Sequence, residues 1–182
     1  METIKEKYAR LRPQIKEGDL ILFHGKSLLS KVIQESDQNA YFNHVGVVGD
    51  IAGSLFIIDS NRGGVKPDRL SDRVYSYTDG DFIIIKSFKT KSEITKALSK
   101  LLKRTDYVKP KYDFINGAKS LINRMFGTNL KTKPNPFRVI CSMYVLPYAL
   151  ELDIVYPLSD MNDLFYPQDY VREIKDGKMI GI

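Results

Sequence analysis

Three side chains of the chain have clear potential for nucleophilic or acid–base chemistry, namely Cys141, His24 and His44. A cysteine thiolate is a strong nucleophile, and a neighbouring histidine usually activates it. A third polar group commonly fixes the orientation of that histidine ring. These residue types therefore suit acyl transfer through a cysteine. The competing interpretation is structural, because free cysteine is among the most deeply buried residue types.

Cys141 occupies a favourable place for a nucleophile. Hydrophobic spacing predicts a helix over residues 139–152, so the thiol lies near the start of this helix. Unpaired backbone N–H groups and the positive end of the helix dipole stabilise a thiolate at such a position. The sequence thus predicts that the single cysteine stands where its reactive form is favoured.

His44 and Asp59 are the first choices for the partners of this thiol. His44 begins a predicted strand directly after a polar loop, a place where catalytic groups are commonly displayed. Asp59 ends the next predicted strand and would orient the His44 ring, with Ser60 or Asn61 as alternatives. His24 ends the first predicted strand and is either a surface residue or part of the same cleft. The structural alternatives are a hydrogen-bonded core imidazole at His44 and an Asx turn at Asp59.

Hydrophobic patterning predicts the elements that must position these groups. Short apolar or β-branched runs predict strands at residues 20–23, 44–48, 55–60 and 82–88. Helical spacing of apolar residues predicts helices at residues 3–11, 27–35, 91–104, 112–126 and 139–152. Clustered strands followed by helices favour an α+β fold, in which an antiparallel or mixed sheet packs against helices.

Length and composition limit the class of protein. The 182 residues suit a single domain, and 43% hydrophobic with 27% charged residues argues against a wholly disordered chain. One cysteine excludes an intrachain disulfide framework and cysteine-rich zinc sites. We expect one domain with four parts: a lead-in with a helix (1–17), a strand-rich part with the histidine (18–88), a helical part with the cysteine (89–155) and a tail (156–182).

A basic surface supports a second hypothesis, a non-catalytic module that binds an anionic partner such as nucleic acid, lipid or another polymer. The net charge is +6, and basic residues gather on the predicted helix at Lys96, Lys100, Lys103 and Arg104. Such a face can contact anions, although charged outer faces are the norm for amphipathic helices. No recognised nucleic-acid signature is present, so this hypothesis ranks below the enzyme.

The sequence carries no obvious targeting or membrane signal. Its charged first 19 residues lack the apolar core of a signal peptide. Its longest apolar runs fall far short of the roughly 20 residues that a membrane helix needs. We therefore expect a cytoplasmic protein without a transmembrane segment.

Four short segments, in this order, carry a family resemblance: residues 18–23 (GDLILF), 43–48 (NHVGVV), 56–60 (FIIDS) and 141–142 (CS). They resemble permuted papain-like cysteine hydrolases of the NlpC-type superfamily, on the branch of YiiX-like proteins and lecithin:retinol acyltransferase. In that branch the histidine strand precedes the cysteine helix, as it does here. Residues 112–114 and 166–169 also resemble family segments. The chain departs from the family at Met143, where an acidic residue is common, which leaves the subgroup open.

The resemblance implies a circularly permuted papain-like fold and a Cys141–His44–Asp59 triad. It implies hydrolysis of an amide, isopeptide or ester bond, or acyl transfer, through an acyl-thioester and without a cofactor or metal. The substrate would be a small peptide or an acyl compound. Backbone N–H groups at the helix start would stabilise the oxyanion, and Tyr112, Ser142 and His24 are further substrate or oxyanion candidates. The residues are also compatible with a degenerate family member that has no turnover. They are compatible with any oligomeric state.

Overall fold

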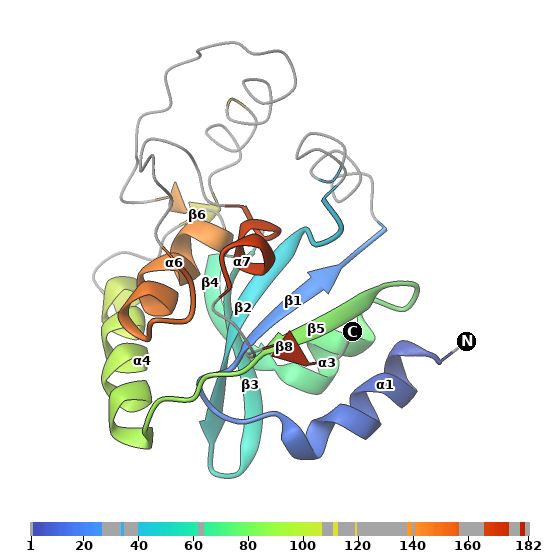
Figure 1. The fold of residues 1–182 in the computed structure, drawn as a ribbon, viewed down its shortest axis with the longest axis horizontal. Coiled ribbons are helices and arrows are strands. Elements are labelled where there is room, and N and C mark those ends of the chain that lie inside the picture. The colour runs from blue at the N-terminus through green and yellow to red at the C-terminus, as the bar shows by residue number, and fades with distance from the viewer. Residues whose placement is uncertain are drawn as a thin grey trace.

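A six-stranded antiparallel sheet forms the centre of the molecule (Figure 1). The computed structural model describes residues 2–26, 34, 40–61, 64–106, 111–112, 119, 138–139, 141–156, 166–174 and 179–180. The sheet order is β4 (Gly64–Arg69), β3 (Ser54–Asn61), β2 (His44–Ile51), β1 (Leu20–His24), β5 (Asp81–Ile85) and β8 (Met179–Ile180). Every neighbouring pair in it is antiparallel.

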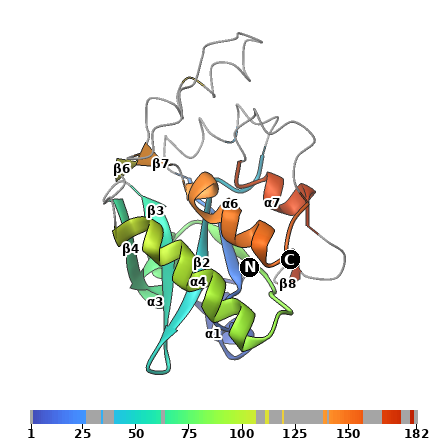
Figure 2. The same cartoon turned by 90° about the vertical axis from the view of Figure 1, so that its left-hand side faces the viewer.

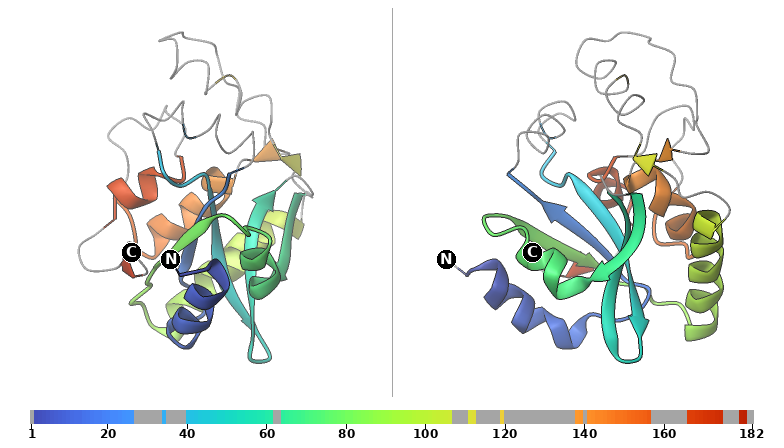
Figure 3. Two further views of the ribbon diagram at one scale, coloured as in Figure 1. Left: turned by 90° about the vertical axis from the view of Figure 1, so that its right-hand side faces the viewer. Right: turned by 180° about the vertical axis from the view of Figure 1, so that it is seen from behind.

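Helices cover both faces of this sheet. The long helix α4 (Lys91–Asp106) and helix α6 (Cys141–Glu151) lie on one face (Figure 2). Helices α1 (Ile4–Leu11) and α3 (Leu70–Tyr75) lie on the opposite face (Figure 3). The fold is therefore α+β with an antiparallel sheet between helices, which confirms the predicted class.

The remaining described elements are short. They are the 3-10 turn Arg12–Gln14, the parallel strand pair β6 (Lys111–Tyr112) and β7 (Arg138–Val139), and helix α7 (Asp169–Arg172). Strand β7 lies directly before α6 in the chain and pairs with β6, and α7 lies near α6 (Figures 1 and 2). Strand β7 and helix α7 therefore lie close to the start of the cysteine helix.

The side-chain alternation of the strands divides the core into two hydrophobic layers. Leu20 and Leu22 of β1 point toward α4 and α6 and are fully buried. Ile21 and Phe23 point toward α1 and α3 and are also fully buried. Burying a side chain of this size contributes about 1.5–3 kcal/mol. A sheet that is apolar on both faces explains the continuous apolar run of β1.

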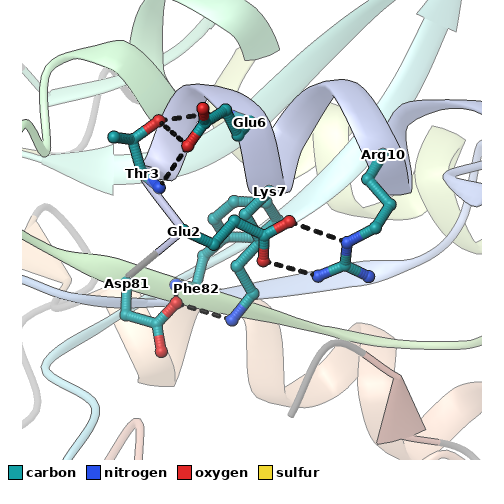
Figure 4. Close-up of polar contacts among 7 residues, drawn as sticks. All are labelled: Glu2, Thr3, Glu6, Lys7, Arg10, Asp81 and Phe82. Carbon is teal, nitrogen blue, oxygen red and sulfur yellow. Dashed lines mark hydrogen bonds and ion pairs between the residues drawn. The ribbon is translucent and has the colours of Figure 1, made fainter.

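Helix α1 begins with a capping box that the sequence encodes locally (Figure 4). The backbone N–H of Glu6 donates to Thr3 Oγ1 at 3.3 Å, and the backbone N–H of Thr3 donates to Glu6 Oε2 at 2.7 Å. One turn further, Lys7 Nζ lies 2.6 Å from Asp81 Oδ1 at the start of β5. The cap fixes where the helix begins, and the ion pair attaches it to the sheet.

The Gly18-Asp19 pair fixes the entry into β1. Asp19 is buried and accepts hydrogen bonds from Lys86 Nζ and, at 3.1 Å, from the backbone N–H of Ser87. Burial raises the pKa of Asp19, and these hydrogen bonds oppose that rise. Gly18 adopts a φ of 92°, which favours glycine, and its carbonyl accepts from Tyr148 Oη at 2.9 Å. This part of the family-like pattern is therefore structural.

Most predicted elements are observed, with small shifts of their ends. The predicted helices at 3–11 and 91–104 are confirmed as α1 and α4, and the predicted strands as β1, β2, β3 and β5. The helix predicted over 139–152 begins at Cys141, because residues 138–139 form β7 instead. The predicted helix start at Tyr112 is wrong, since Tyr112 ends β6, and residues 113–118 and 120–126 of that prediction lie outside the described residues. The helix predicted over 27–35 also lies outside them, except for residue 34.

Among the helices and strands of six or more residues, β4 and α3 had no clear signal in the sequence. Strand β4 pairs only with β3 in the sheet order, and its mostly exposed residues show no apolar alternation. As an edge strand it also accommodates Pro67, which could not donate to a second neighbour. Helix α3 has six residues, too few for a periodic pattern. Both elements form because they pack against β3.

None of the helices in the described part of the chain combines the length and the apolarity that crossing a membrane requires.

Candidate active site

A buried imidazole–carboxylate pair forms the centre of the candidate site. His44 is the first residue of β2, and Asp59 lies in the neighbouring strand β3. His44 Nε2 lies 2.8 Å from Asp59 Oδ2, within hydrogen-bond distance. The Asp59 side chain is fully buried and that of His44 is 11% exposed. His44 starts the first strand of this hairpin and Asp59 lies near the end of the second, so the antiparallel pairing of β2 with β3 places them side by side at its open end.

Two further side chains hold the Asp59 carboxylate. Asn61 Nδ2 donates to Asp59 Oδ1 at 3.0 Å, and Arg73 Nη2 lies 3.4 Å from the same oxygen. Arg73 Nη2 also lies 2.6 Å from Asp68 Oδ2. Of the candidates for orienting His44, Asp59 therefore faces the imidazole, and Asn61 contacts the Asp59 carboxylate. A buried carboxylate needs such compensation, because an unpaired charge is costly away from water.

The charges around His44 favour its protonated form. Burial of the imidazole alone would lower the pKa of His44. The electrostatic influence of Tyr77, Cys141 and Asp59 opposes this effect, as does the hydrogen bond to Asp59, and the pKa of the imidazole is raised well above its ordinary value. The resulting imidazolium is a proton donor and a partner for an adjacent anion.

Cys141 begins helix α6 and is 3% exposed. It belongs to the hydrophobic layer under α4 and α6, whereas the His44 ring lies beside Phe23 of the other layer, with 6.1 Å between ring centroids. Within the described residues no hydrogen bond joins the thiol to the imidazole, and Cys141 is one of the groups whose electrostatic influence raises the pKa of His44. Asp59 occupies Nε2, so Nδ1 is the nitrogen available to the thiol. Catalytic hydrogen bonds are often long in an unliganded enzyme.

Ser142 and Tyr170 lie beside Cys141 at the start of α6. The Ser142 hydroxyl is buried and has no hydrogen-bond partner among the described residues. The Tyr170 hydroxyl, from α7, donates to the Ser142 carbonyl at 2.6 Å. Burial raises the pKa of Tyr170 well above its ordinary value, and the electrostatic influence of Cys141 and Asp169 adds to that rise. The first N–H groups of a helix have no partner within it, so this region can accept an oxyanion.

Asn43 and Gln168 fix the chain that leads into His44. The Asn43 amide exchanges two hydrogen bonds with the backbone of the residue after β1, at 3.0 and 3.3 Å. Gln168 Oε1 accepts from the backbone N–H groups of Tyr41 at 2.9 Å and Phe42 at 3.1 Å. These contacts set the starting position of the histidine strand. The family-like segment at residues 166–169 was the sequence signal for Gln168.

The structure places His24 and Tyr112 outside the His44–Asp59 pair. His24 ends β1, and its ring stacks on Tyr41 with centroids 4.1 Å apart. Its Nδ1 lies 2.7 Å from the Tyr41 carbonyl oxygen. The Tyr112 backbone pairs with Val139, two residues before Cys141, and the Tyr112 side chain lies outside the described part. His24 therefore belongs to a surface contact, and the Tyr112 backbone lies near Cys141.

Three residues of the site had no signal in the sequence, namely Tyr77, Arg73 and Tyr170. The first two lie on or after α3, a helix that the apolar pattern did not predict. Tyr77 reaches the site by stacking on Phe23 of β1, with centroids 4.6 Å apart. Contacts between elements, which a local pattern does not encode, therefore bring these side chains to His44 and Cys141.

The glycine of the His-Val-Gly segment leaves room for the Asp59 strand. A Cβ at Gly46 would lie 2.5 Å from Ile57 Cγ1 and 3.1 Å from Asp59 Cβ, closer than packed atoms allow. We expect Gly46→Ala to lower the free energy of unfolding by about 1–3 kcal/mol, since overpacking displaces β3. Urea unfolding measures the change.

The matched control for this prediction is Gly49→Ala in the same strand. Its added Cβ would lie 3.2 Å from Ile58 Cδ1, the end of a flexible side chain. We expect a smaller loss of stability for this variant. Equal losses in the two variants would show that Gly46 has no special packing role.

Comparison with known proteins shows the fold of the chain. No protein-family model matches the chain, and no curated protein matches its sequence. The structure is similar to the crystal structure of the metalloprotein yiiX from Escherichia coli O157:H7, with a TM-score of 0.58 and 19% sequence identity. The match covers 87% of this chain and 80% of that chain. This likeness confirms the predicted YiiX-like fold.

The name of that neighbour raises the question of a metal site here. A protein metal site draws on clusters of His, Cys, Asp or Glu side chains. Across the ranges that the structure describes, no group of three or more such side chains is arranged to hold a metal ion. The described residues therefore do not fit a metal centre, and the chemistry below is derived from Cys141, His44 and Asp59.

Proposed function

We propose that the protein is a cysteine hydrolase that cleaves an amide or ester bond by acyl transfer. Cys141 is the nucleophile, His44 the acid–base group and Asp59 the residue that orients the imidazole. The observation that carries this proposal is the buried His44–Asp59 pair, 2.8 Å between Nε2 and Oδ2. The only cysteine of the chain begins α6, the helix that packs against the histidine strand β2. The YiiX-like fold is consistent with the proposal.

The first half of the reaction forms an acyl-enzyme. The Cys141 thiolate attacks the carbonyl carbon, and the carbonyl π electrons move to oxygen. The leaving nitrogen or oxygen takes a proton from His44 Nδ1 as its bond to carbon breaks, and a thioester remains on Cys141. Backbone N–H groups at the start of α6 stabilise the oxyanion.

The second half of the reaction returns the free enzyme. His44, now neutral, takes a proton from water, and the hydroxide attacks the thioester carbonyl. The C–S bond breaks, the acid is released and Cys141 leaves as a thiolate beside the imidazolium. The Asp59 carboxylate stabilises the imidazolium each time it forms. It also holds the ring so that Nδ1 points away from the carboxylate. In an acyltransferase another nucleophile would replace water in this half.

The alternative is a non-catalytic module for an anionic partner. Lys96 and Lys103 are exposed on α4, while Lys100 Nζ lies 2.5 Å from Glu151 Oε1 in a surface ion pair. The Arg104 side chain lies outside the described residues. An exposed basic helix face binds anions weakly and is screened by salt. We therefore expect any contact of this face with an anionic polymer to be weak.

Alkylation by iodoacetamide tests the activation of Cys141. Cys141 is 3% exposed, which limits access of the reagent. We therefore expect its labelling in the folded protein at neutral pH to depend on the imidazolium that stabilises the thiolate. His44→Gln should slow the labelling by about 10-fold or more, since it removes this charge. Intact-protein mass spectrometry against time gives the rate.

His24→Gln is the matched control, because it removes a histidine that contacts Tyr41 instead of Asp59. Its labelling rate should equal that of the unchanged protein. Slow labelling that does not respond to His44→Gln would contradict the hydrolase. If this came with salt-sensitive retention on DNA, the binding module would be favoured instead.

A further inference from the structure

We propose that the pocket between the end of β1 and the turn after α3 binds a carboxylate group of a ligand through Arg73 and Lys26. The assignment of this ligand as the substrate rests on the proposed hydrolase function. The binding itself does not depend on turnover. The inference therefore adds a chemical class, an anionic polar substrate, to the reaction proposed for Cys141.

The pocket has the size of a small-molecule site. Its volume is about 430 Å³, and it is lined by residues 25–26, by Arg73 and by residues 76–80. Ligand pockets commonly fall between about 300 and 1,000 Å³. A Cβ on Gly80 would lie 2.3 Å from the His24 carbonyl oxygen, so the turn after α3 packs tightly against the end of β1. Two closely joined backbone segments thus form the walls of the pocket.

Arg73 and Lys26 bring unused hydrogen-bond donors to this pocket. Arg73 uses Nη2 for both of its carboxylate contacts, with Asp59 and Asp68. Among the described residues its Nε and Nη1 have no carboxylate partner, and Lys26 forms no ion pair. A guanidinium carries five N–H donors and an ammonium carries three. Both cations therefore retain donors for an incoming carboxylate.

The rest of the lining is polar and suits a charged group more than an acyl chain. Ser76, Tyr77 and Thr78 contribute three consecutive hydroxyl-bearing side chains. The Ser76 hydroxyl donates to the Arg73 carbonyl at 2.7 Å, which holds the turn to the helix. Asp79 is the acidic residue of the lining and opposes an anion. A lipid tail would gain little here, because burial against polar groups provides little hydrophobic free energy.

Two residues connect the pocket to the His44–Asp59 pair. Arg73 lines the pocket and contacts Asp59 at 3.4 Å. Tyr77 lines it as well and stacks on Phe23, whose ring lies next to that of His44. A ligand carboxylate in the pocket would therefore be separated from Asp59 by one side chain, Arg73, and from His44 by two, Tyr77 and Phe23. This position suits a group that anchors a substrate beside the acid–base residue.

A titration of the full chain followed by backbone amide NMR tests the pocket. Succinate, a dicarboxylate, should shift the amides of residues 25–26 and 76–80, while neutral succinamide should leave them in place. Lys26→Gln should weaken succinate binding by about 10-fold, the usual effect of one charge-assisted hydrogen bond. Asp79→Asn should strengthen it. Both positions are exposed, so these variants should fold normally.

Lys96→Gln, an exposed lysine on α4 away from the pocket, is the matched control and should bind succinate like the unchanged chain. Three results would overturn the proposal that this pocket binds a carboxylate: shifts only at other amides, equal binding of succinamide, or an unaltered affinity in Lys26→Gln. Inorganic phosphate that binds as tightly as succinate would overturn the preference for a carboxylate. Succinate binding together with an unactivated Cys141 would support carboxylate binding in the pocket and contradict the hydrolase function.

Discussion

Cys141→Ala is expected to abolish turnover, with a loss of at least about 10³-fold in the rate of hydrolysis of p-nitrophenyl acetate, an activated ester. The thiol forms the only bond to the acyl group in the proposed reaction, so no other side chain replaces it. The unchanged protein should also accumulate an acyl adduct that intact-protein mass spectrometry detects. The adduct should be absent from the variant.

The fold should survive this substitution. Cys141 is buried in the layer under α4 and α6, and its thiol makes no hydrogen bond within the described residues. Its truncation removes one sulfur atom from the core, which we expect to cost on the order of 1 kcal/mol. Urea unfolding of both proteins verifies that the loss of activity is chemical. An alanine variant that hydrolyses the ester at the original rate would remove Cys141 from the mechanism.

Asp59→Asn is expected to lower turnover by about 10²–10⁴-fold, the size of effect seen when a histidine loses its orienting carboxylate. The substitution changes the side-chain volume little. The variant removes the negative charge that faces His44 and Arg73. The pKa of His44 should then fall from its raised value, because one of the charges that favours the imidazolium is gone. NMR titration of the imidazole measures this shift directly.

The same substitution changes the pH dependence of stability. The pKa of His44 is raised in the folded protein, so the ion pair stabilises the fold fully below the ordinary histidine pKa of about 6.5. This contribution is lost as the pH rises through the raised folded pKa. We therefore expect the free energy of unfolding to fall from pH 6 toward high pH, and to fall less in Asp59→Asn. Urea unfolding across this range measures both curves.

Asp50→Asn is the matched control for the Asp59 variant. Asp50 is exposed in the same strand as His44, and its Oδ1 accepts a hydrogen bond from Gly53 N that an asparagine keeps. Its activity and pH curve should equal those of the unchanged protein. An Asp59→Asn variant that behaves like this control would show that Asp59 is a buried packing residue without a role in orienting His44.

Side-chain periodicity predicted much of the scaffold. The apolar spacing along α1 and α4 corresponds to helices that pack on the sheet with one face. The continuous apolar run of β1 corresponds to a strand that is buried on both faces. The same reasoning placed Cys141 close to a helix start and His44 at a strand start, and both positions are observed. These features depend on nearest neighbours in the chain, which is why the sequence contains them.

Prediction was weaker where an element is short or sits at an edge. Strand β4 and helix α3 had no usable pattern, and the helix predicted from Tyr112 begins with a strand residue instead. Six residues do not form an independent helix in water, so α3 depends on its packing against β3 and α1. The site residues that follow from it, Arg73 and Tyr77, were therefore missed as well.

The identities of Cys141, His44 and Asp59, and their order along the chain, were available before any coordinates. Their relation in space was not. The register of β2 against β3 sets the contact between the imidazole and the carboxylate, and the docking of α6 on β2 and β3 sets where the thiol lies relative to this pair. Register and docking result from burial of apolar surface that is distant in sequence, so they appear only when the whole core is assembled. The pocket beside Arg73 has the same origin, because two segments almost fifty residues apart form it.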